Sequence, residues 1–346
     1  MMLALYIVTV IFIISPFFPA TRNPHWFFRT PDFIRAQTVV IQVILLVLLL
    51  ILIKTFSTEI LILLAALGIS TIYQLVKIIP YTSVYPRKKN PFSSDGHVSI
   101  LAANVLQDNK DYNDFIGLVG KFDPDLVLTM ESDSHWENAL QEIENNYPFT
   151  VKIPLENYYG MHLYSRVKLE SVETNFLVEN DVPSIFFKYP AAGNPIFFTC
   201  LHPAPPSPTE NETAKERDAE LMIVGKKIRD MDCSAVVCGD MNDVVWSRTT
   251  RLFRKLTGML DPRIGRGFYS TFHARYSFLR FPLDHLFHTR DLLVGKMTRS
   301  QYFGSDHFAM YYEIHYKASQ ETPENPDLTV EEVEEVEELI RRPENE

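Results

Sequence analysis

Three long segments without a charged side chain constrain this chain more than any other feature. Residues 1–20, 36–53 and 60–76 hold no Asp, Glu, Lys or Arg and consist mostly of Leu, Ile, Val, Phe and Ala. Each is close to the roughly 20 apolar residues that an α-helix needs to cross a bilayer. We therefore expect three transmembrane helices within residues 1–80. A cleaved signal peptide is the alternative for the first segment, which lacks the basic start and the small-residue cleavage site of such peptides.

Lysines and arginines near these segments predict an orientation. Arg22, Arg29 and Arg35 follow the first segment, Lys54 follows the second, and the Arg-Lys-Lys of residues 87–89 follows the third. Short loops rich in Lys and Arg stay in the cytoplasm. The count favours a multi-pass protein of the cell membrane with a cytoplasmic first loop and a cytoplasmic C-terminal domain.

The rest of the chain divides by composition into three parts. Residues 81–97 are rich in Pro, Ser and basic side chains and are typical of a linker. Residues 98–317 are long enough for one domain with a large core. The formal charge is -10, but residues 319–346 hold eleven acidic and two basic side chains, so the acidity lies in the tail. The run "TVEEVEEVEELIRR" is compatible with a short helix, but dense like charge favours disorder or fraying over residues 318–346.

Strand-like and helix-like patterns alternate through residues 98–317. The apolar runs typical of strands are residues 97–105, 125–130, 160–166, 196–202, 235–242, 283–289 and 307–317. Helical patterns occupy 111–122, 211–231 and 247–258. In residues 308–316 apolar positions alternate, which gives that strand one apolar face. Mixed elements with many strands predict an α/β domain of layered sheets covered by helices.

Polar side chains recur where these apolar runs begin or end. They are Asn104, Glu131, His202, Asp240, Asn242, Asp284, Asp306 and His307. If the strands lie side by side, these groups meet at one edge. Carboxylates, amides and imidazoles gathered in this way suit metal-assisted hydrolysis of a phosphate ester.

The residue types suggest roles for several of these groups. Glu131 is the best candidate for a Mg²⁺ ligand, because Mg²⁺ prefers carboxylate oxygen. Asp284 or Asp306 can orient the imidazole of His307, which would then manage a proton. Amides and a second imidazole can donate hydrogen bonds to phosphoryl oxygens.

Seven short motifs in order carry a family resemblance. "ANV", "LTMES", "YSR", "TCLH", "GDMND", "PLDH" and "GSDH" resemble the endonuclease/exonuclease/phosphatase superfamily, also called DNase I-like, over residues 98–317. The three apolar segments are similar to those of its membrane-attached bacterial branch. The resemblance implies a four-layered αββα sandwich and cleavage of phosphodiesters or phosphomonoesters with Mg²⁺ or Mn²⁺.

On the metal side, the resemblance matches Asn104 to an amide beside phosphate and metal, and Glu131 to a metal ligand. Asp306 matches a second carboxylate on that side. Some nucleases of the family pair their first histidine with a glutamate, and Glu156 is a candidate for that partner.

On the catalytic side, the resemblance matches His202 to a phosphate-contacting residue. Asp240 and Asn242 match the pair that aligns the water and holds the phosphate. Asp284 matches the acid that orients the catalytic imidazole, His307.

A basic stretch lies near these motifs. Residues 247–281 contain eight basic side chains against one acid. Charge runs are usually solvated faces, but arginine can also grip phosphate in two places. Arg275 and Arg280 are the predicted substrate-binding residues, because they closely precede "PLDH".

The predicted function is a membrane-anchored hydrolase of phosphate esters, and the substrate stays open. Nucleic acid, a phospholipid headgroup and a small phosphodiester are the candidates, and no obligate protein partner is indicated. Nucleic-acid binding favours a large basic surface, which a nearly neutral domain lacks. One alternative is a catalytically inactive, membrane-tethered binding or scaffold protein. Another is a transport or sensing unit, which the uncharged spans disfavour, although Gln42 and Gln74 are polar.

Overall fold

The computed structural model describes residues 2–53, 55, 57–87, 93–231, 233–317 and 326–341. The chain forms two compact units. The unit with the apolar helices, which we call the membrane unit, comprises Met1–Arg87, Trp246–Arg248 and Arg263–Phe268. The unit with the two sheets, which we call the catalytic unit, comprises Lys88–Val245, Thr249–Pro262 and Tyr269–Glu346.

The first sheet of the catalytic unit has six strands in the order β10-β11-β1-β2-β4-β3. Their bounds are β1 Gly96–Asn104, β2 Leu126–Met130, β3 Phe149–Ile153, β4 Met161–Ser165, β10 Leu293–Arg299 and β11 Met310–Tyr316. β1 runs parallel to β2 and antiparallel to β11. The ends of β1 and β2 therefore lie at one edge, beside the start of β11.

The second sheet has five strands in the order β5-β6-β7-β8-β9. Their bounds are β5 Glu170–Asn175, β6 Ser184–Tyr189, β7 Ile196–Leu201, β8 Ala235–Asp240 and β9 Asp284–His288. β7 and β8 are parallel, and β9 returns antiparallel to β8. The ends of β7 and β8 thus lie beside the start of β9.

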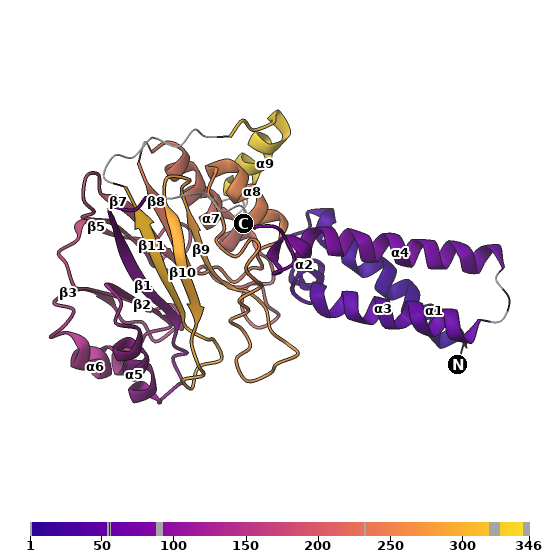
Figure 1. Ribbon diagram of the computed structural model, residues 1–346, viewed down its shortest axis with the longest axis horizontal. Coiled ribbons are helices and arrows are strands. Elements are labelled where there is room, and N and C mark those ends of the chain that lie inside the picture. The colour runs from indigo at the N-terminus through magenta and orange to yellow at the C-terminus, as the bar shows by residue number, and fades with distance from the viewer. Residues whose placement is uncertain are drawn as a thin grey trace. The chain divides into compact units, whose positions relative to one another are not determined.

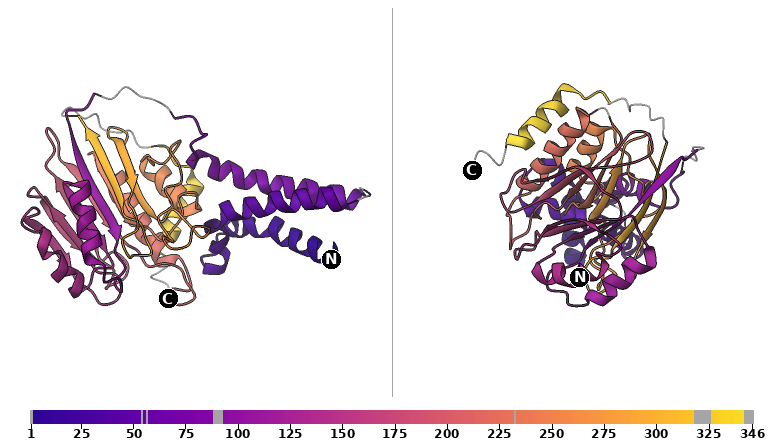
Figure 2. Two further views of the ribbon diagram at one scale, coloured as in Figure 1. Left: turned by 60° about the horizontal axis from the view of Figure 1, so that its bottom comes forward. Right: turned by 90° about the vertical axis from the view of Figure 1, so that its left-hand side faces the viewer.

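The two sheets pack face to face, with helices on their outer faces (Figures 1 and 2). The central core takes apolar side chains from both sheets, among them Val98, Ile100, Phe187, Phe198 and Val236. α5 (Tyr112–Phe122), α6 (Ser134–Ala139) and η3 (Leu140–Ile143) cover the six-stranded sheet. α7 (Lys215–Arg229), α8 (Arg248–Thr257) and α9 (Val330–Arg341) cover the five-stranded sheet. The predicted four-layered αββα sandwich is confirmed.

The acidic tail is more ordered than the sequence analysis predicted. Helix α9 buries Val336 and Leu339 in the outer core beside α7 and α8. Two ion pairs link it to these helices: Lys226 Nζ lies 2.7 Å from a Glu337 oxygen, and Lys255 Nζ lies 2.6 Å from a Glu332 oxygen. Residues 330–341 are thus helical, because apolar burial and ion pairing offset the repulsion between like charges. Residues 318–325 and 342–346 lie outside the described residues.

The membrane unit is helical. Its elements are α1 (Met2–Ile14), η1 (Ser15–Thr21), α2 (Trp26–Phe33), α3 (Arg35–Leu52), α4 (Thr58–Ile78) and η2 (Ile79–Tyr81). Among the described residues, three helical segments are long and apolar enough to cross a membrane: Met2–Thr21, Arg35–Leu52 and Thr58–Tyr81. They agree with the three segments expected from the sequence.

Polar side chains join these three helices to one another. Gln42 Nε2 on α3 donates to Phe12 O at 2.7 Å and to Ser70 Oγ at 2.9 Å, and Gln74 Nε2 donates to Gln42 Oε1 at 2.7 Å. Ser70 Oγ donates to Ile13 O at 3.0 Å. Such bonds hold apolar helices together where no water competes. The two glutamines thus take part in packing the three helices.

Candidate active site

Strand ends bring the predicted polar residues to one edge of the catalytic unit. Asn104 is the last residue of β1, and its neighbour in the ladder is Met130, which Glu131 follows. In the other sheet, Asp240 ends β8 and pairs with Asp284, the first residue of β9. The sheets meet here, because Asn104 Nδ2 donates to Asp240 Oδ2 at 3.1 Å.

The turn after β8 needs special backbone geometry. Gly239 has φ 139°, and a Cβ there would lie 1.9 Å from Leu201 O. Only glycine fits at such a position. Asn242 follows with φ 48°, a left-handed conformation that asparagine tolerates, and its N donates to Asp240 Oδ1 at 3.0 Å. Glu131, with φ 59°, is left-handed as well. Unusual backbone conformations of this kind concentrate at functional sites.

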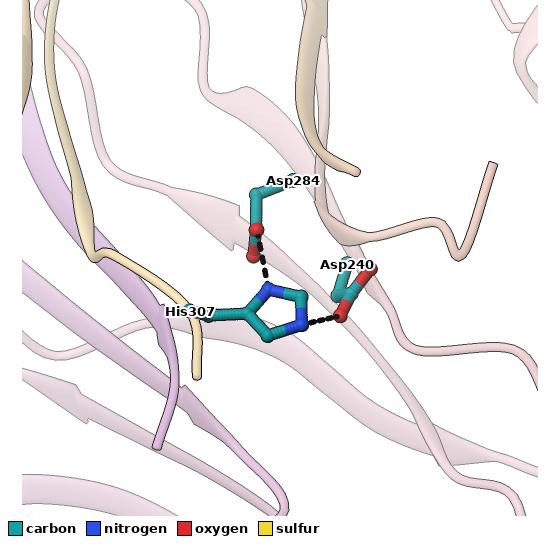
Figure 3. A group of neighbouring side chains, drawn as sticks. All are labelled: Asp240, Asp284 and His307. Atoms are coloured by element: carbon teal, nitrogen blue, oxygen red, sulfur yellow. Dashed lines mark hydrogen bonds and ion pairs between the residues drawn. The ribbon is translucent and has the colours of Figure 1, made fainter. Parts of the chain in front are cut away.

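His307 lies between two buried carboxylates (Figure 3). Its Nδ1 is hydrogen-bonded to Asp284 Oδ2 at 2.8 Å, and its Nε2 lies 3.4 Å from Asp240 Oδ2. All three side chains are buried. The sequence left open whether Asp284 or Asp306 orients the imidazole, and in the structure Asp284 is the hydrogen-bond partner.

The charges of this group shift the pKa values of its members. Burial lowers the pKa of His307, but Asp240 and Asp284 outweigh it and raise the value to about 10. Burial raises the pKa of Asp240, yet His307, His202 and two hydrogen bonds leave it below its ordinary value. The pKa of Asp284 is raised, chiefly by burial. At neutral pH the group is therefore an imidazolium beside an ionised Asp240.

Asn104 and Glu131 form the other half of the site. Asn104 Nδ2 donates to Glu131 Oε1 at 2.7 Å as well as to Asp240, so one amide links the two carboxylates. Gln107 N donates to Glu131 Oε2 at 3.4 Å. Burial raises the pKa of Glu131 to about 7, and the nearby Asp306 and Asp240 add to the rise. A cation beside Glu131 would favour its charged form.

The donor set beside Glu131 fits a hard cation. Within the described part of the chain, the buried Oδ1 of Asp306 accepts no hydrogen bond. Two carboxylates with unused oxygen lone pairs, next to an amide oxygen, match the preference of Mg²⁺ and Mn²⁺. Asp240, Asp284 and His307 also have potential ligand atoms within 4.8 Å of one another. There, however, both ring nitrogens of His307 already face carboxylates, so that group is better suited to holding a proton.

His202 and Asn242 border the same edge. His202 Nε2 lies 4.0 Å from Asp240 Oδ2, and burial lowers its pKa to about 4. Its Nδ1 has no hydrogen-bond partner among the described residues. Asn242 Nδ2 donates to Pro203 O at 3.0 Å, which ties the two turns together. Tyr159, which the sequence analysis missed, lies beside His202 with ring centroids 5.6 Å apart.

The remaining predicted residues lie near the edge without joining this network. Arg275 is exposed and donates from Nε to Tyr302 Oη at 2.9 Å, and Arg280 donates to Ala274 O at 3.1 Å. Glu156 is exposed, and its Oε1 accepts from Ser134 Oγ at 2.8 Å. The expectation that Glu156 partners the first histidine is therefore not met, since its carboxyl is engaged at the start of α6.

Arg217 on α7 is the main residue that the sequence analysis overlooked. It is buried, and its Nη1 donates to Asn242 O at 2.8 Å. Its Nη2 lies 2.7 Å from Asp218 Oδ1 and 3.6 Å from Asp243 Oδ2. The turn after β8 thus rests on a buried ionic group. By sequence, a buried arginine in a helix of mixed basic and acidic residues cannot be distinguished from an exposed one. The sequence therefore carried no signal for Arg217.

Comparison with solved structures supports the same architecture. D. rerio TDP2 complexed with single-strand DNA product has a TM-score of 0.55 at 17% identity, covering 64% of this chain and 100% of its own. The endonuclease/exonuclease/phosphatase from Bacteroides vulgatus gives 0.53 at 17% identity, with coverage of 64% and 100%. The human nocturnin catalytic domain with bound sulfate gives 0.52 at 13%, with coverage of 64% and 95%. At these identities the likeness establishes the fold.

Comparison with curated protein sequences finds no match. The model of the endonuclease/exonuclease/phosphatase family, in contrast, matches residues 101–307, which is more than half of the chain. That span begins in β1 and ends at His307, so it includes all the strand ends described above. The chain therefore belongs to the endonuclease/exonuclease/phosphatase family, whose members hydrolyse phosphoester bonds.

Proposed function

We propose that this protein is a membrane-anchored, Mg²⁺- or Mn²⁺-dependent hydrolase of phosphodiesters or phosphomonoesters. The observation that carries the proposal is the buried hydrogen bond of 2.8 Å between His307 Nδ1 and Asp284 Oδ2, with Asp240 on the opposite side of the ring. Family membership makes hydrolysis the expected chemistry.

Glu131 and Asp306 would hold the cation, with Asn104 beside them. When bound, the cation would neutralise charge that develops on the phosphoryl oxygens. Asn104 already contacts both Glu131 and Asp240. The amide of Asn104 can therefore hold Glu131, on the metal side, and Asp240, on the proton-transfer side, in a fixed position relative to each other.

The chain's own groups divide the remaining work. Asp240 is ionised, because the charged imidazole of His307 lowers its pKa, so its carboxylate can orient the attacking water and accept its proton. His307, held by Asp284, can donate from Nε2 to a phosphoryl oxygen. Neutral His202 and the amide of Asn242 would supply further hydrogen bonds to the phosphate. Arg275 and Arg280 would receive the charged part of the substrate.

The apolar helices would anchor the enzyme in the cell membrane. The Lys and Arg count around them favours a cytoplasmic catalytic unit. A reporter fused after residue 346 tests on which side of the membrane the catalytic unit lies. A reporter active only in the cytoplasm supports the proposal, and one active only in the periplasm contradicts it.

The hydrolase is tested with the full chain in lipid nanodiscs. Product release is measured from an oligonucleotide, a phospholipid, bis(p-nitrophenyl) phosphate and p-nitrophenyl phosphate, with Mg²⁺, Mn²⁺ or chelator. His307→Ala should abolish metal-dependent turnover, whereas His315→Ala, at the far end of β11, should retain it. A folded chain that binds metal but turns over none of these substrates would favour the tethered binding or scaffold protein.

A further inference from the structure

A hairpin of residues 272–281 exposes apolar side chains next to the candidate active site. Phe272 N donates to Phe281 O at 3.1 Å, and His273 N donates to Leu279 O at 3.0 Å, so the hairpin is closed by backbone hydrogen bonds. At its tip, Tyr276 is 52%, Phe278 69% and Leu279 39% exposed. A folded segment that presents three large apolar side chains together is typical of an interaction surface.

Cationic side chains flank this apolar tip on both sides. The sequence of residues 275–280 is "RYSFLR", with an arginine at each end. Among the described residues neither guanidinium pairs with a carboxylate, since Arg275 donates to Tyr302 Oη and Gly304 O, and Arg280 donates to Ala274 O. The hairpin therefore presents an apolar centre with a positive border.

The hairpin is continuous with the catalytic residues. Ala274 N donates to Asp306 O at 2.6 Å, and the ring of Phe272 lies 5.0 Å from that of His307, centroid to centroid. Whatever the tip binds is consequently held next to the edge where phosphate would react.

A short length of chain connects this hairpin to a segment of the membrane unit. Residues 263–268 belong to the membrane unit, where Gly265 N donates to Pro80 O at 2.9 Å, at the end of the third apolar segment. Phe272 follows Phe268 by four residues, and an extended chain of that length spans at most about 14 Å. One chain thus carries both this hairpin and three helices that are apolar enough to cross a membrane, and this connection favours membrane lipid as the partner.

We propose that the hairpin of residues 272–281 docks onto a bilayer that contains anionic lipids, so that the active site takes a phosphoester from the membrane surface. Tyr276, Phe278 and Leu279 enter the interfacial layer, and the two arginines meet lipid phosphates. Interleaved aromatic and basic residues also suit single-stranded nucleic acid, but the aliphatic Leu279 in the tip and the nearly neutral domain favour lipid. The substrate class, though not the docking itself, rests on the proposed hydrolase function.

The test places a fluorescent probe on the tip of the full chain. Cys233→Ser removes the one cysteine that is not fully buried, and Phe278→Cys is labelled with the dye NBD. The protein is reconstituted in phosphatidylcholine vesicles with phosphatidylglycerol and nitroxide-labelled lipids. Val172→Cys on β5, where Val172 is 42% exposed, is the matched control. Leu279→Cys is a second labelling position, so the result does not depend on one variant folding well.

Nitroxide lipids are expected to quench the probe at residues 278 and 279 and to leave the probe at residue 172 unquenched. Replacing Arg275 and Arg280 with glutamine should weaken the binding of the hairpin to vesicles that contain phosphatidylglycerol, by about fivefold per arginine. Equal quenching at residues 278 and 172, or none at 278, would overturn the proposal. A probe that responds to a single-stranded oligonucleotide and not to lipid would also overturn it and assign the surface to nucleic acid.

Quenching reports where the hairpin lies and is independent of turnover. An unquenched probe on an active enzyme would overturn docking alone. A quenched probe on a chain that hydrolyses no phosphoester would support docking and contradict the hydrolase.

Discussion

Replacing Asp284 with asparagine tests the electrostatic basis of the site. The substitution keeps the shape of the side chain and removes the charge 2.8 Å from His307 Nδ1. The pKa of His307 stands at about 10 against an ordinary 6.5, and this rise corresponds to about 5 kcal/mol. Asp240 and Asp284 share that effect, and an opposite charge at this range moves a pKa by about 1 to 3 units. We expect the pKa of His307 to fall by that amount in Asp284→Asn.

The sign of the stability change follows from the raised pKa. A histidine whose pKa is higher in the folded state stabilises the fold fully below pH 6.5, and this stabilisation is lost as the pH rises through about 10. Asp284→Asn should therefore cost about 1 to 4 kcal/mol below the ordinary histidine pKa, with a smaller loss at higher pH. Relief from burying the Asp284 charge offsets part of this cost, because burial raises the pKa of that carboxyl.

NMR titration of the imidazole measures the pKa directly, and denaturant unfolding in chelator measures the free energy. Turnover should fall between about 100-fold and 10,000-fold, the range for losing a positioned acid or base. Asp114→Asn, an exposed carboxylate on α5, is the control. An unchanged His307 pKa in Asp284→Asn, or an equal fall in Asp114→Asn, would refute the reasoning.

Four further predictions test other parts of the structure. Glu131→Gln should weaken Mg²⁺ binding by at least about 100-fold in calorimetry, since losing even an outer partner of a metal ligand costs up to that much; a normal affinity would remove Glu131 from the metal site. In the unaltered protein, Mg²⁺ affinity should fall about tenfold per pH unit below about 7, because Glu131 must lose its proton to bind; an affinity independent of pH would contradict this. Arg217→Met should lower the unfolding free energy by about 3 to 5 kcal/mol, because it removes a buried cation that contacts two buried carboxylates; a loss below about 1 kcal/mol, the value of a surface pair, would contradict the buried network. Leu339→Ala should cost about 2 to 5 kcal/mol, and a cost no larger than that of Val333→Ala, an exposed position on the same helix, would show that α9 does not pack as described.

The strands that form the site were predictable because they are short apolar runs that end in polar side chains. Strands β3, β5, β6 and β10 were missed. The residues of β5 are mostly exposed and polar, and the buried and exposed positions of β10 follow no clear alternation. The order of α9 was not expected, because its like charges resemble those of a disordered tail, whereas Val336 and Leu339 find partners only after α7 and α8 have formed.

The sequence by itself determined the three apolar segments, the layered α/β class and the order of the polar residues at strand ends, because each is a local pattern of side-chain chemistry. Only the tertiary structure decided that Asp284 is the carboxylate bonded to His307 Nδ1, that Arg217 supports the turn after β8, and that a hairpin with an apolar tip lies beside Asp306. These contacts join residues distant in sequence, and their energies depend on burial and distance. Burial and distance are fixed only when the two sheets have packed against each other.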